Sequence, residues 1–194
     1  MTNSPIWLTG DPEADRLLTE DDNALLIGML LDQQVPMEKA FTGPLVIAQR
    51  MGGKLDVAAI AAMPEDEFAA LCSRPPAIHR FPASMAKRVR QLCHVLTEEY
   101  GREASNIWRD GKTGGEVKKS LVSLPGFGED KAAIFAAVLG KRRGITPPGW
   151  REAAGSYGED GSYRSVADIV DADSLAQVRD TKRAVKAAKK AVVS

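Results

Sequence analysis

Residues 116–140 read EVKKSLVSLPGFGEDKAAIFAAVLG and predict two helices joined by a tight turn. The proline of the turn cannot continue the first helix, and Gly126 can adopt the positive φ of a helix end. We expect Phe127 to cover the core. Apolar residues recur at helical spacing on both sides of the turn: Val117, Leu121 and Leu124 before it, and Ile134, Phe135, Val138 and Leu139 after it.

The second helix of this hairpin is expected to begin directly after Gly128, with Glu129, Asp130 and Lys131 in its first turn. The first amides of a helix have no partner within the helix and lie at the positive end of its macrodipole. The hairpin could therefore bind a phosphate group. An ordinary turn between two helices is the alternative.

The segment LPGFGEDKA, residues 124–132, resembles the hairpin of the helix-hairpin-helix (HhH-GPD) DNA glycosylase superfamily. The resemblance implies an all-α fold with two helical lobes and a DNA cleft between them. It also implies that Gly126, Phe127, Gly128 and Lys131 bind one phosphate of double-stranded DNA, and that the protein acts as a monomer. No cofactor is implied, apart from a monovalent cation that could accompany the phosphate.

A second motif lies at the end of a helix predicted from Asn23, where residues 30–36 read LLDQQVP. The proline favours an end to this helix. LLDQQ resembles the early helix of the same superfamily, which implies that Gln34, beside Gln33, fills the gap left when a base is extruded from DNA. A side-chain amide suits that role because it can plug the gap and pair with unmatched base edges. The alternative is that two polar residues merely mark a helix end.

The composition predicts one domain or two closely packed lobes, since 44% of the 194 residues are hydrophobic. No apolar run reaches the roughly 18 residues of a membrane span, and no signal-peptide pattern is visible. We therefore expect no membrane contact and a cytoplasmic, nucleoid-associated location. Cys72 and Cys93 are too few for an iron–sulfur cluster or a closed zinc site, so we expect free thiols in the core and no metal site.

The formal net charge of zero conceals an uneven distribution. Residues 1–70 hold 4 basic and 12 acidic residues, whereas residues 71–194 hold 22 basic and 14 acidic ones. The excess of positive charge thus lies in the half with the hairpin, as expected for a surface that faces phosphates, although a solvated face and a basic tail fit equally. Lys87 and Arg88 lie on a helix expected from a cap at Ser84 and are candidates for phosphate contact, with a solvated face as the alternative.

Three parts of the chain are expected. Residues 1–22 form an extension that packs on the core, residues 23–165 form the helical domain, and residues 166–194 form a basic tail, either docked or frayed. Residues 6–8 could be a short strand or a plug, and residues 151–165 are expected to be loop-like. We interpret His94 as a core or boundary residue and His79 as a candidate for DNA contact.

Cleavage of a glycosidic bond develops positive charge on the sugar, which a carboxylate can stabilise. The catalytic aspartate that the resemblance implies would fall near Pro148, but no carboxylate occurs between Asp130 and Glu152. Glu152 is therefore the first candidate, and Asp130 could act from the hairpin helix. Asp160 and Asp32 are weaker candidates.

Bifunctional members of the superfamily use a hairpin lysine at the position that Asp130 holds here. Lys131, the third catalytic candidate, comes one residue later, which turns its side chain by about 100°. We also expect Glu129 and Asp130 to keep its amine protonated. The resemblance thus implies a monofunctional DNA glycosylase, with a non-enzymatic DNA-structure or lesion-binding protein on the same scaffold as the alternative.

The state of the cleft distinguishes these two functions. A carboxylate in a cleft near Gln34 would favour the enzyme. A cleft filled by Trp7 or Trp150 would favour the binding protein.

Overall fold

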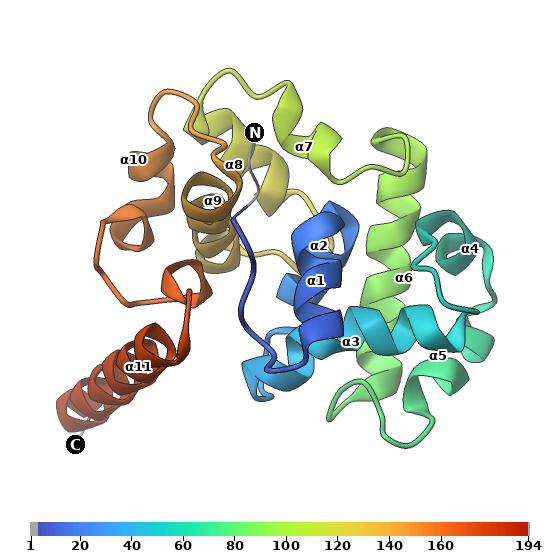
Figure 1. The fold of residues 1–194 in the computed structure, drawn as a ribbon. Helices are drawn as coiled ribbons and strands as arrows, with labels where there is room; N and C mark the ends of the chain where they lie inside the picture. Colours follow the sequence, from blue (N-terminus) through green and yellow to red (C-terminus); the bar gives the residue numbers. More distant parts are fainter. Residues whose placement is uncertain (1–3, 194) are drawn as a thin grey trace.

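A computed structural model describes residues 4–193, and every regular element in that range is helical (Figure 1). The prediction of an all-α fold is confirmed. The α-helices are α1 (Pro12–Glu20), α2 (Asp22–Leu31), α3 (Met37–Arg50), α4 (Val57–Ala62), α5 (Glu65–Ser73), α6 (Pro82–Glu99), α7 (Ser105–Arg109), α8 (Gly114–Val122), α9 (Glu129–Arg143), α10 (Trp150–Ala154) and α11 (Ala172–Val193). Two 3₁₀ helices, η1 (Gly155–Gly158) and η2 (Val166–Asp168), connect α10 to α11.

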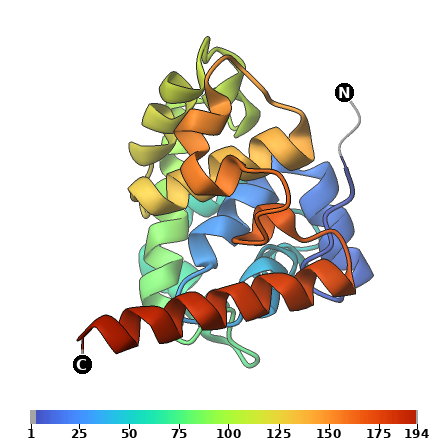
Figure 2. The same cartoon turned by 90° about the vertical axis from the view of Figure 1, so that its left-hand side faces the viewer.

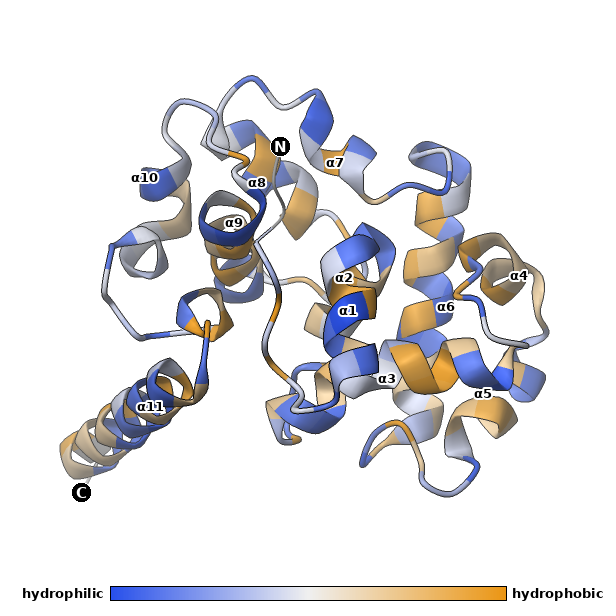
Figure 3. Cartoon of the chain, viewed as in Figure 1, coloured by the Kyte–Doolittle hydropathy of each residue, from blue (hydrophilic) through white to orange (hydrophobic). Residues whose placement is uncertain are grey.

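Helices α2 and α9 form the centre of the molecule. Residues 24–31 of α2 are all buried, which is expected of a helix that is apolar on every side. Around α2 pack α1, α3 and α6, while α4 and α5 pack on α6; α9 packs on α8, α10, η1 and η2. Apolar residues gather on the helix sides that face neighbours, whereas hydrophilic and apolar residues alternate along α11 (Figure 3). The two-lobed cleft stays an expectation of the resemblance.

Aspartates start several helices of the acidic N-terminal half. The Asp11 carboxylate accepts hydrogen bonds from two amides of the first turn of α1, and Asp21 does the same for α2. Asp56 accepts from one amide at the start of α4. Such caps satisfy amides that have no partner in the helix and place negative charge at the positive helix end. Part of the acidic excess therefore stabilises the fold.

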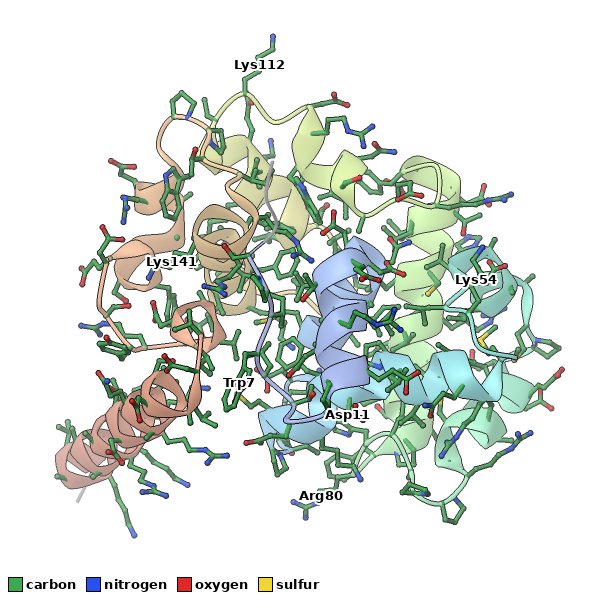
Figure 4. All side chains as sticks on the ribbon, in the orientation of Figure 1. Trp7, Asp11, Lys54, Arg80, Lys112 and Lys141 are labelled. Carbon is green, nitrogen blue, oxygen red and sulfur yellow. The ribbon has the colours of Figure 1, made fainter. Side chains whose placement is uncertain are left out.

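Residues 4–10 form a strap across the core and contain no strand. Ile6 and Leu8 are buried, so the plug interpretation is the one that the structure supports, while Trp7 is half-buried beside them (Figure 4). The buried Asp15 carboxylate accepts hydrogen bonds from the amide of Leu8, at 3.1 Å, and from the amide and hydroxyl of Thr9. These bonds fix the strap against α1.

Several expectations from the sequence are wrong. Ser84 is not a cap, because α6 already begins at Pro82, and proline is favoured in the first turn of a helix. His94 is exposed, because it lies on the side of α6 opposite the buried stripe. Residues 151–165 are not simply loop-like, since they contain most of α10 and all of η1.

The expectation of free thiols in the core is confirmed, since Cys72 and Cys93 are both buried and unpaired. The described part of the basic tail forms helix α11, Ala172–Val193. Within residues 4–193, no helix has the length and apolar character needed to span a membrane.

Candidate functional site

The turn of the hairpin is fixed on the core by its glycine and its phenylalanine. Gly126 has φ +80°, and a Cβ atom built there would lie 3.3 Å from Leu30 Cδ1. Phe127 is buried and meets Phe135 edge to face, with ring centroids 6.1 Å apart. Both observations explain why this position of the turn holds glycine and why Phe127 covers the core as predicted.

The N-terminus of α9 lies open to solvent. Gly128 is its N-cap, with φ −95° and ψ 179°, and no side chain caps the helix. A Cβ atom built at Gly128 would find no atom within 4 Å. The amides of the first turn are therefore accessible to a ligand, and they lie where the macrodipole favours an anion. Glu129 does not reach back to them, since its carboxylate pairs with Lys118 at 3.1 Å.

Gln33 is held in place, whereas Gln34 projects from the surface. The Gln33 side chain donates to the Leu30 carbonyl, at 2.9 Å, and accepts from the guanidinium of Arg88, at 3.0 Å. Gln34 is exposed and has φ +55°, a left-handed conformation that non-glycine residues seldom adopt. This conformation persists because the hydrogen bonds of the neighbouring Gln33 fix the backbone next to it.

His79 fixes the same loop and is not a DNA contact, because it is only 2% exposed. Its Nδ1 accepts from the amide of Phe81, so Nε2 carries the proton and donates to the Gln33 carbonyl at 2.8 Å. Arg88, too, is engaged by the protein through Gln33. Lys87 is exposed on α6 and lies 3.7 Å from Glu65, at a distance where an exposed pair contributes little to stability.

Lys131 connects the hairpin to the end of α2. Its Nζ donates to the carbonyls of Met29, at 2.8 Å, and Leu30, at 3.0 Å, and lies 3.5 Å from that of Asp32. Burial lowers the pKa of Lys131 to about 8, although the charge of Asp32 acts in the opposite direction. The amine therefore stays mostly protonated near pH 7, as expected, but the charge that favours this form is that of Asp32. Glu129 and Asp130 have other partners.

A cavity of about 540 Å³ lies beside Gln34, between the end of α2, the start of α9, η1 and α11. Its lining residues are Asp32, Gln33, Gln34, Asp130, Ile134, Ser156, Tyr157, Arg164, Thr181, Lys182, Val185, Lys186 and Lys189. The cavity thus brings together two carboxylates that the sequence places about a hundred residues apart. It also brings Gln34, the residue predicted to fill the gap left by an extruded base, to the same place.

The two carboxylates of this cavity differ in their surroundings. Asp130 is exposed and accepts a hydrogen bond from the Tyr157 hydroxyl at 2.8 Å. Burial, together with this hydrogen bond, raises the pKa of Tyr157 to about 12, so the phenol stays a neutral donor. Burial raises the pKa of Asp32, against the charges of Lys182 and Lys131. Asp130 can therefore act as an accessible carboxylate, while Asp32 is partly shielded.

Glu152 and Asp160 do not line this cavity. Glu152 is exposed on α10, and Asp160 pairs with Arg151 at 3.1 Å. Glu152 therefore stays a prediction from the sequence that this cavity does not support, because the chain returns to the start of α9 through η1 and presents Tyr157 there instead.

Neither tryptophan named as a plug occupies the cavity. Trp150 packs on α9, where a Cβ atom at Gly140 would come within 2.3 Å of its ring. Trp7 lies in the strap and is also absent from the lining residues. The cavity beside Gln34 thus remains open to a ligand.

Residues near the site include several that the sequence did not single out. Phe81 is 44% exposed in the loop that His79 ties to Gln33, and the Arg80 guanidinium lies 5.2 Å from its ring centre. Arg80 extends away from the protein (Figure 4). The available signal was the aromatic residue between Arg80 and Pro82. The sequence alone did not place Tyr157 or the lysines of α11 at this cavity.

The described residues contain no group of three or more His, Cys, Asp or Glu side chains that could hold a metal ion. One family model matches the chain, that of the HhH-GPD superfamily base excision DNA repair protein, over residues 27–191. The match includes the end of α2, the hairpin, η1 and nearly all of α11. No curated protein and no solved structure matches.

Proposed function

The chain belongs to the HhH-GPD superfamily of base excision DNA repair proteins, and we propose that it is a monofunctional DNA glycosylase that extrudes a damaged base into the cavity beside Gln34. The observation that carries the proposal is the lining of this cavity. Two carboxylates, Asp32 and Asp130, share an open space of about 540 Å³ with Gln33 and Gln34. A volume of this size falls within the range of small-molecule sites.

DNA would be held at two points in this proposal. The open N-terminus of α9 binds a backbone phosphate, which positions the duplex without reading its sequence. Gln34 enters the base stack in place of the extruded nucleotide, and its left-handed backbone keeps the side chain projecting outward. Phe81, which is exposed next to the same loop, is available to stack on a neighbouring base.

Asp130 is the proposed catalytic carboxylate. As the base departs, positive charge develops on the sugar, and an anionic group close to it stabilises the transition state. Tyr157 donates to one oxygen of Asp130 and so orients the carboxylate. The other oxygen is then available to accept a proton from the water that attacks the sugar. Asp32 supplies a second carboxyl group in the lining of the same cavity.

Lys131 does not act as a nucleophile in this proposal, even though burial lowers its pKa to about 8. A Schiff base requires a neutral amine that reaches the sugar. The Lys131 amine instead donates to main-chain carbonyls at the end of α2, and Lys131 is not among the residues that line the cavity. We therefore expect the product to be an intact strand with an abasic site, and no covalent adduct to be trapped by borohydride.

The test is a screen of purified protein against duplexes that each contain one damaged base, with released base and alkali-labile sites as readouts. Asp130→Asn should lower the rate of base release at least about a hundredfold, as expected when a charge that stabilises a transition state is removed. Glu152→Gln is the matched control, since it removes a carboxylate outside the cavity, and it should leave the rate unchanged.

Two outcomes would overturn the proposal. Loss of activity in Glu152→Gln with retention in Asp130→Asn would move the chemistry away from the cavity. Tight binding of a lesion duplex without release of any base across the whole screen would indicate the non-enzymatic lesion-binding protein.

A further inference from the structure

We propose that α11 is a second binding surface for the DNA backbone, in which Lys182, Lys186 and Lys189 hold phosphates across the mouth of the cavity. This inference rests on the proposed function, because it places duplex DNA at that cavity. It adds an element that lies about 50 residues beyond the hairpin turn and that no sequence motif had assigned to DNA.

Helix α11 packs on the protein through its first part. Ser174 and Val178 are buried. The Asp171 carboxylate caps the helix start by accepting from the Ser174 amide, and the Ser174 hydroxyl accepts from the Asp171 amide. Arg179 pairs with Glu38 of α3. Beyond Thr181, the residues up to position 192 are exposed. Figure 2 shows α11 running along one side of the molecule, with its C-terminal end beyond the other helices.

The exposed part of α11 has a basic face directed at the cavity. The residues of α11 that line the cavity have the spacing of one helix face: Thr181, Lys182, Val185, Lys186 and Lys189. Among the described residues, none of the three lysines has a carboxylate within ion-pair distance, whereas Arg179 and Arg183 of the same helix each have one. Three ammonium groups, none within ion-pair distance of a described carboxylate, therefore border the space proposed for the extruded nucleotide, and the charge of Lys182 also acts on Asp32 in the same cavity.

The spacing of these lysines suits a DNA strand. At 1.5 Å per residue, Lys182 and Lys189 lie about 10 Å apart along the helix axis. Successive phosphates of one strand rise by about 3.4 Å along the duplex axis, so the lysine face spans about three phosphates. The long and flexible lysine side chains bind phosphates as point charges, which does not require a fixed geometry. The hairpin and α11 would thus hold the backbone on two sides of the cavity.

The experiment measures binding of an undamaged duplex as a function of salt, using fluorescence anisotropy. The test variant is Lys182→Ala/Lys189→Ala. Its matched control is Arg183→Ala/Lys190→Ala, which removes the same charge at the same seven-residue interval, each residue turned about 100° away from its test partner. Alanine preserves helix propensity in both variants, and circular dichroism verifies the helix content.

We expect the test variant to lose about two units from the slope of log affinity against log salt, with about tenfold weaker binding at low salt, since each phosphate contact contributes about 0.9 to that slope. The control should change the slope by less than half a unit. Equal losses in both variants would show only a general effect of charge and would overturn the proposal, as would the absence of a loss in the test variant.

The outcome also separates this inference from the proposed function. If Gly128→Asp at the hairpin weakens binding while the α11 variants do not, DNA binding at the hairpin stands and the role of α11 falls. If the unmodified protein binds no duplex at any salt concentration, both proposals fall.

Discussion

The two ends of the α2 and α9 pair are each joined by one basic side chain of α9, yet the two junctions differ in nearly every respect. At one end, Arg143 is 3% exposed and donates to the Asp22 carboxylate, at 3.0 Å, and to the Leu18 carbonyl, at 2.6 Å. At the other end, Lys131 is half-buried and donates only to main-chain carbonyls of α2.

The helix dipoles explain the difference. Arg143 lies at the negative C-terminus of its own helix and pairs with an acidic residue at the start of α2, so both the helix dipole and the ion pair favour its charge. Lys131 lies at the positive N-terminus of its own helix, and the carbonyls at the end of α2 offset that cost. The Arg143 junction therefore stabilises the fold. The Lys131 junction instead leaves the N-terminus of α9 open to an anion and Gln34 exposed.

The largest expected effect is on stability at the Arg143 junction. Asp22→Asn should lower the free energy of unfolding by about 3 kcal/mol, because it leaves a buried guanidinium without its counter-charge. Urea unfolding followed by circular dichroism measures this change. Asp22→Asn/Arg143→Met should recover part of the loss, since it also removes the buried charge. A change below about 1 kcal/mol in the single variant would mean that this junction is no stronger than the other.

The next largest effect concerns DNA binding at the opposite end. Gly128→Asp should weaken binding to every duplex about 30-fold, or about 2 kcal/mol, because the carboxylate occupies the phosphate site. The same substitution should slightly stabilise the fold, since aspartate is a better N-cap than glycine and the site has space for a Cβ atom. Gly128→Ala is the control without charge. Unchanged affinity in a stabilised Gly128→Asp variant would contradict the phosphate site.

A smaller effect is expected at the exposed glutamine. Gln34→Ala should retain binding to intact duplex and lose about fivefold, or about 1 kcal/mol, in preference for a duplex with an abasic site. Competition binding with the two duplexes measures the preference. Equal weakening on both duplexes would instead place Gln34 among general backbone contacts.

The smallest effect is expected for Lys131→Met, which should cost about 0.5 kcal/mol at pH 7 because water can solvate the freed carbonyls of α2. The pH dependence is more informative. The pKa of Lys131 falls from the ordinary 10.5 to about 8 in the folded protein, so between these values the unfolded chain binds a proton that the folded chain has lost. Stability of the unmodified protein relative to the variant should therefore rise with pH across this window.

Urea unfolding of both proteins from pH 7 to pH 10.5 measures this difference. Any other group whose protonation changes does so in both proteins and cancels in the comparison. A constant difference across the window would show that burial does not shift this pKa.

The sequence predicted the helices well because glycines and prolines mark their ends, as Gly52 does after α3 and Pro125 does after α8. The exposure of His94 could also have been predicted, since it lies about 200° from Leu92 on a helical wheel. The cavity could not be predicted from the sequence. Asp32, Asp130 and Tyr157 meet through the path of the chain after α9, which no periodicity encodes.

The strap of residues 4–10 has a consequence for the time course of folding. The Ser4 amide donates to the Arg142 carbonyl, and Arg142 in turn donates to the Pro5 carbonyl across 137 residues of sequence. During synthesis at about 5–20 residues per second, the strap would wait on the order of ten seconds for this partner. Its apolar residues, Ile6 and Leu8, would then be covered late. Closure of this contact should thus be among the last steps in the formation of the native chain, after α2 has already been packed.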